Sequence, residues 1–145
     1  MNTEAVPEML RRDRAEWEAL VAVLEAHPEG ALHHPESPEW TARDVYTHLA
    51  SWIEHSTDTL EALLARRPFP ASLEGPDDEI NARWQAEHSH MTIAEARAKA
   101  QQAFERRICA IQAVPPDRWN GVIEATARAD GADHYRGHRS YIAVS

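Results

Sequence analysis

The chain has 145 residues, and its 15 Lys and Arg against 24 Asp and Glu give a formal charge of −9. A chain of this length suits one domain and can bury about two-thirds of its unfolded surface, so we expect residues 1–145 to form a single domain without disulfides or a structural metal. The acidic charge would repel a phosphate backbone, which argues against a nucleic-acid partner. One cysteine, no apolar leader and no long apolar run predict a cytoplasmic protein that does not bind membranes.

A first helix is predicted over residues 6–27, where apolar residues recur at helical spacing and Pro7 suits the first turn. Pro28 and the glycine that follows would end it. Residues 33–40 contain two prolines and no apolar period, so we expect a loop there.

A second helix is predicted to begin after Thr41, because Asp44 stands three residues later in the pattern of a capping box. Its apolar stripe runs to about Arg66 and includes His48. Prolines and a glycine then mark a second long connection, in which residues 77–87 could form a short helical turn.

Thr92 and Glu95 repeat the capping pattern and predict a third helix that Pro115 ends, with Arg107 as a weak point on the edge of its apolar stripe. The last helix is expected to start near Gly121 and to run towards the C-terminus. No segment alternates in the way a strand does, so the chain is predicted to be all-α, folded as an antiparallel four-helix bundle. The two inner connections are long enough for a crossover, which leaves the order of the helices open.

The segment His134-Tyr135-Arg136-Gly137-His138 places two histidines four residues apart, so that on a helix both imidazoles point the same way and can bind one metal ion. His48 lies on the apolar stripe of the second helix and is a candidate third ligand. A three-histidine site leaves positions on the metal open, as in catalytic sites. Asp130, one turn before His134, is a candidate to orient that imidazole, although a solvent-facing carboxylate is the alternative.

Other histidines are weaker candidates. His55 lies near the face of His48 and would be the best substitute ligand, whereas His88 and His90, and likewise the neighbouring pair His33 and His34, are expected to face solvent. The alternative for all of these histidines is a structural role with ordinary hydrogen bonds.

Cys109 on the third helix is expected to be partly buried, since spacing assigns it no histidine or cationic partner that would make it a nucleophile. Five tryptophans are expected in the core or along helix seams rather than around a ligand.

The segment from Trp40 to Trp52 together with residues 134–138 resembles the DinB/YfiT-like superfamily. Asn81, the segment 114–119 and Tyr135 are most similar to the ClbS/DfsB branch. This resemblance covers nearly the whole chain and implies a four-helix bundle that is often a homodimer. It also implies a divalent metal bound by one histidine of the second helix and the histidine pair of the last helix, which are His48, His134 and His138 here.

Two functions from different classes follow. The first is a metal-dependent enzyme, of transferase or hydrolase type, that acts on small electrophiles or thiol conjugates; imidazole ligands suit several transition metals, of which we expect nickel or zinc. The alternative is a metal-free bundle that binds or sequesters a small molecule or serves as an interaction module. In both cases the expected partner is a small molecule, with a homodimer as the assembly.

Overall fold

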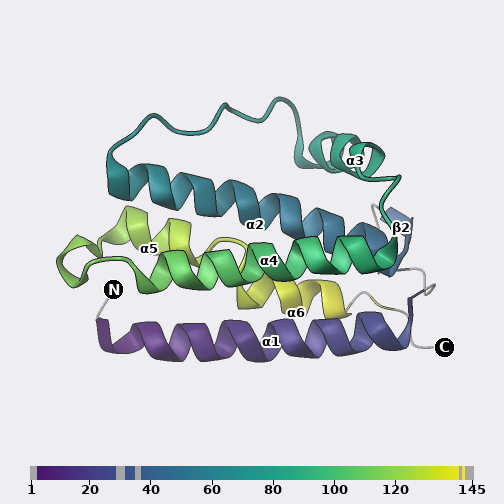
Figure 1. Cartoon of the computed structure of the whole chain (residues 1–145), viewed down its shortest axis with the longest axis horizontal. Helices are drawn as coiled ribbons and strands as arrows, with labels where there is room; N and C mark the ends of the chain where they lie inside the picture. The colour runs from purple at the N-terminus through teal and green to yellow at the C-terminus, as the bar shows by residue number, and fades with distance from the viewer. Residues whose placement is uncertain (1–2, 29–31, 35–36, 141, 143–145) are drawn as a thin grey trace.

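A computed structural model describes residues 3–28, 32–34, 37–140 and 142 (Figure 1). Its helices, in chain order, are α1 (Val6–Ala26), α2 (Ala42–Ala65), α3 (Asp77–Glu87), α4 (Ile93–Gln112), α5 (Gly121–Arg128) and α6 (Ala132–Ser140). Two 3-10 turns, η1 (Thr3–Ala5) and η2 (Pro116–Arg118), and two short strands, β1 (Leu32–His34) and β2 (Ser37–Trp40), complete the described elements.

The long helices form the predicted all-α four-helix bundle, in which α2 packs mainly against α4 and α1 mainly against α6. Figure 1 shows that α1 and α6 run in one direction while α2 and α4 run in the other. The chain between α2 and α4 therefore returns along the whole bundle, with α3 lying against α2 at the end of this crossover. This resolves the helix order that the sequence left open.

Both predicted capping boxes are present. Thr41 caps α2 with Asp44 as its reciprocal partner, and Thr92 caps α4 with Glu95. The α2 helix ends at Arg66, which adopts a left-handed conformation with φ of 55°. These local signals set the starts of α2 and α4 and the end of α2.

Aromatic residues fill the core between α1, α4 and α6. The rings of Trp17 and Phe104 stack with centroids 4.8 Å apart, and Tyr135 meets Trp17 edge-on at 5.1 Å. The Trp17 indole N–H donates to Gln101 Oε1 at 2.9 Å, so its one polar group is paired on burial. Trp17 and Trp40 belong to the core and the other tryptophans are half-buried.

Two predictions about local structure were wrong. Residues 32–34 and 37–40 form an antiparallel ribbon in which Leu32 pairs with Trp40, where a loop was expected. A two-stranded ribbon has an open edge on each strand, so the missing N–H of Pro38 within β2 need not remove a ladder bond.

The second wrong prediction is the continuous last helix, which is broken into α5 and α6. The chain is extended at Ala129 and left-handed at Asp130, where φ is 58°. Gly131 follows, and a Cβ atom there would lie only 2.6 Å from Arg107 Nη2 and 3.0 Å from Asp13 Oδ1. The break thus makes room for a buried ion pair that sequence periodicity could not reveal.

Among the described residues, none of the helices combines the length and apolar character needed to cross a membrane.

Candidate metal centre

The structure brings together the three histidines predicted as ligands. His48 comes from the N-terminal half of α2, and His134 and His138 come from successive turns of α6. The Nε2 atom of His134 lies 3.0 Å from Nε2 of His138 and 3.3 Å from Nε2 of His48. One nitrogen from each ring lies within 4.8 Å of the other two, so the three form one cluster.

These separations match those of ligands on one ion. Two imidazole nitrogens each about 2.0–2.1 Å from a shared metal are roughly 3.4 Å apart at a tetrahedral angle and roughly 2.9 Å apart at a right angle. The observed Nε2 separations fall within this range, and nitrogen donors of this kind suit zinc, nickel, copper or iron. The donor set and its spacing therefore fit a divalent transition metal.

Trp40 covers one side of the cluster. Its ring centroid lies 4.8 Å from that of His48, and its plane is within 9° of the His138 ring at 6.4 Å. Trp40, His48 and His138 are all buried, whereas the His134 side chain is 27% exposed. The cluster is thus closed on the tryptophan side and accessible on the side of His134.

A carboxylate lies behind the most exposed ligand. The Oδ1 atom of Asp130 lies 3.1 Å from Nδ1 of His134, the ring nitrogen that faces away from the cluster, where a carboxylate can orient the imidazole. Burial by itself raises the pKa of Asp130, but the hydrogen bond and charge of His134, with smaller contributions from Ser56 and Arg107, outweigh it. The net pKa is below its ordinary value, so the carboxylate is ionised at neutral pH.

This arrangement orients His134. A carboxylate accepts hydrogen bonds, so its place beside Nδ1 leaves Nε2 of the same ring facing the other two histidines. An Nε2 atom directed at the other two Nε2 atoms is oriented as a metal ligand requires.

The other histidines whose side chains the structure describes do not join the cluster. His55 contacts Trp52 edge-on instead, His88 follows the end of α3 half-buried, and His90 is exposed. The side chains of His33 and His34 lie outside the described part of the chain.

Cys109 is exposed rather than partly buried, because it faces away from the stripe that buries its neighbour Ile108. Sequence reasoning also missed the buried pair Arg107 and Asp13, whose charged atoms are 2.6 Å apart. The only signal in the sequence was Arg107 itself, an arginine on the edge of an apolar stripe, which was interpreted as a weak point of the predicted helix.

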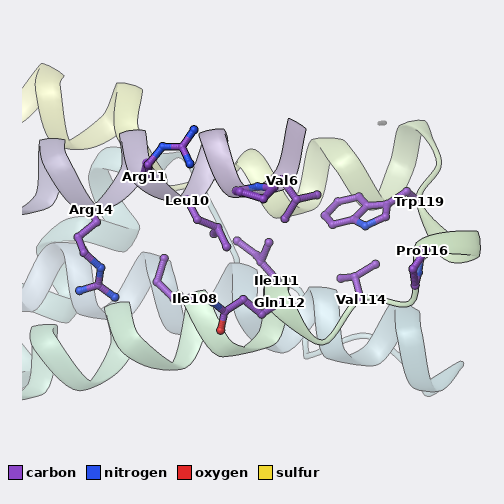
Figure 2. Close-up of a pocket in the computed structure, with 11 residues that line it drawn as sticks. Val6, Leu10, Arg11, Arg14, Ile108, Ile111, Gln112, Val114, Pro116 and Trp119 are labelled. Atoms are coloured by element: carbon purple, nitrogen blue, oxygen red, sulfur yellow. The ribbon is translucent and has the colours of Figure 1, made fainter. Parts of the chain in front are cut away.

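A separate apolar groove lies between the N-terminal half of α1 and the C-terminal end of α4 (Figure 2). Its cavity is about 500 Å³, within the usual range of small-molecule sites. The groove is lined mainly by apolar side chains, with Trp119 at one end and Arg14 at the other. None of the clustered histidines lines it.

The fold and the cluster define a four-helix bundle with a three-histidine site, and comparison with known proteins identifies its family. The profile of the DinB superfamily matches residues 12–142, so the chain belongs to this superfamily. Metal binding is general in the superfamily, and the cluster fits that property.

A crystal structure of an uncharacterised protein from Escherichia coli UTI89 is similar in fold, with a TM-score of 0.76 and 13% sequence identity over 94% of this chain and 89% of that chain. At this identity the likeness shows the fold alone. No curated protein matches the chain. The finer resemblance to the ClbS/DfsB branch stays a prediction.

Proposed function

We propose that this protein is a metal-dependent enzyme of transferase or hydrolase type that acts on small electrophiles or thiol conjugates. His48, His134 and His138 would hold a divalent transition metal, nickel or zinc. The observation that carries the proposal is the meeting of three Nε2 atoms from two helices, with Asp130 behind one of them. Three imidazoles crowded in this way would be hard to explain as ordinary surface histidines.

A bound metal would supply a Lewis acid that lowers the pKa of a coordinated water or thiol. The protein's own contribution is to orient the three imidazoles towards one another. Trp40 shields His48 and His138 from solvent, which lowers the local dielectric, and the exposed edge of His134 leaves an approach for substrate.

The substrate would be a small molecule rather than nucleic acid, since the net charge of −9 opposes a polyanion. A homodimer belongs to the same proposal and is tested by light scattering during size-exclusion chromatography.

Elemental analysis of protein purified without a histidine tag tests the site. We expect about one equivalent of a transition metal per chain, lost in His48→Ala and in His138→Ala and kept in the matched control His55→Ala, which lies on the same helix as His48. If the purified protein contains no metal and does not bind added nickel or zinc, the proposal is overturned.

The apolar groove supports a second candidate function, the binding or sequestration of a small hydrophobic molecule without metal. Titration with an apolar fluorescent dye tests it. If the groove is the binding site, Trp119→Ala should lower the affinity for the dye severalfold, while His138→Ala should leave this affinity unchanged. Equal dye binding by wild type and Trp119→Ala would exclude this role for the groove.

A further inference from the structure

The joint between α5 and α6 places a carboxylate on the histidine cluster. Asp130 adopts a left-handed conformation there, with φ of 58°, which non-glycine residues rarely do and aspartate tolerates better than most. In this conformation its carboxylate lies 3.1 Å from Nδ1 of His134 and is only 17% exposed. An uncommon backbone conformation and a directed side chain thus coincide at one residue.

One buried ion pair ties both sides of this joint together. On the α5 side, Nη2 of Arg107 donates to the carbonyl oxygen of Ala127 at 2.6 Å. On the α6 side, Oδ1 of Asp13 accepts the N–H of Ala132 at 2.9 Å, so a side chain from α1 satisfies the start of the helix. Arg107 and Asp13 bind each other at 2.6 Å and are 3% and 4% exposed.

This clamp, defined as the Asp13–Arg107 pair with its bonds to Ala127 and Ala132, costs desolvation of two charges. Well-packed apolar residues of similar volume would stabilise the bundle at least as much as the ion pair does. A gain in folding stability therefore does not explain why the pair is present. What apolar residues could not supply is directional bonding to the last turn of one helix and the first turn of the next.

We propose that Asp130 is a positioning residue of the metal site and that the clamp holds it in place. The inference rests on the proposed function, because it describes how the chain prepares His134 for a metal. The Asp130 carboxylate lies against Nδ1 of His134 and orients this ring so that Nε2 faces the cluster, and the clamp fixes the joint at which Asp130 takes its left-handed conformation.

Cobalt(II) binding to the metal-stripped protein, followed by its visible absorption, tests the role of Asp130. Glycine and asparagine both accept a left-handed conformation, so Asp130→Gly and Asp130→Asn remove the charge while sparing the joint. We expect Asp130→Gly to bind cobalt about 10- to 100-fold more weakly with an altered spectrum, and Asp130→Asn to fall between it and wild type.

The matched control is Asp133→Asn, since Asp133 is 77% exposed on α6 and pairs with Arg12 rather than with a histidine. Wild-type affinity and spectrum in Asp130→Gly would overturn the positioning role. Failure of wild type and the control to bind cobalt at all would instead overturn the proposed function, so the two failures are distinguishable.

Arg107→Lys tests the clamp, because lysine keeps a charge beside Asp13 but cannot also reach Ala127 as the guanidinium does. Circular dichroism identifies a temperature at which Arg107→Lys is folded. At this temperature we expect the variant to bind cobalt about tenfold more weakly than wild type. Arg106→Lys, whose site pairs with exposed acids, is the control. A spectrum and affinity equal to wild type in Arg107→Lys would show that the clamp does not position the site.

Discussion

The two helix pairs of this bundle are built differently. In the first pair, α2 and α4 are 24 and 20 residues long, unbroken and each opened by a capping box. The buried face of α4 is rich in alanine, which lets the helices approach closely. In the second pair, α1 packs against α6, which is only 9 residues long and follows a break.

Polar contacts hold the second pair. Besides the buried Asp13–Arg107 pair, Arg139 of α6 binds Glu16 of α1 at 2.7 Å. The broken pair also contributes two of the three clustered histidines and Asp130. The comparison indicates that the regular pair forms the scaffold and supplies His48, whereas most of the histidine cluster lies where the helix is interrupted and buried polar groups determine the geometry.

The largest effect should come from breaking the ion pair of the second helix pair. Arg107→Ala leaves the buried carboxylate of Asp13 without its partner, and we expect it to lower the free energy of unfolding by about 3–5 kcal/mol. Urea denaturation measures it. Arg106→Ala, one residue away with partly exposed partners, should cost less than about 1 kcal/mol. Similar losses in both variants would contradict the contrast.

Added metal should stabilise the site that joins the two helix pairs. Zinc at a hundred times its dissociation constant should stabilise the metal-stripped wild type by about 2.7 kcal/mol, because a ligand of the folded state alone favours that state. His138→Ala should gain far less, while His55→Ala should behave as wild type. Differential scanning fluorimetry with and without zinc provides the measurement, and an equal gain in His138→Ala would place the metal elsewhere.

The two glycines beside the histidine pair should respond in opposite directions. Gly131→Ala brings a Cβ atom against the clamp and should destabilise the fold by about 1–3 kcal/mol. Gly137→Ala meets nothing within 4 Å and should stabilise α6 by up to about 1 kcal/mol through helix propensity. Thermal unfolding of both variants compares them; a stable Gly131→Ala would mean that the joint is not tightly packed.

The smallest effect concerns a bond away from the site. The Tyr46 hydroxyl donates to Glu25 at 2.7 Å, and this bond, helped by Arg97, lowers the pKa of Glu25 despite the opposing effect of burial. A lowered carboxyl pKa adds stability above the unfolded pKa that is lost as the pH falls through the folded pKa.

Tyr46→Phe should therefore cost less than about 1 kcal/mol at neutral pH, and the cost should shrink in acid. Urea denaturation at about pH 7 and about pH 3 checks the sign. A cost that grows on acidification would show that the hydroxyl acts through something other than Glu25.

Much of the scaffold could be predicted because its signals are local. Thr41 with Asp44 and Thr92 with Glu95 announce helix starts within four residues, and the apolar stripes follow from a repeat of 3.6 residues. The ribbon of β1 and β2 was not predicted because its strands are too short to show alternation. The break in the last helix was not predicted because the residues that require it, Asp13 and Arg107, lie on α1 and α4.

The sequence by itself determined α1, α2 and α4, the capping boxes of α2 and α4, and the spacing of the histidine pair of α6, since each depends on neighbours along the chain. Only the tertiary structure decided that His48 meets His134 across 86 residues and that Arg107 meets Asp13 across 94. Such meetings depend on the packing order of the helices and on where one of them breaks. Buried charges determine where the last helix breaks, because a buried charge is stable only where hydrogen-bonding partners from distant segments satisfy it.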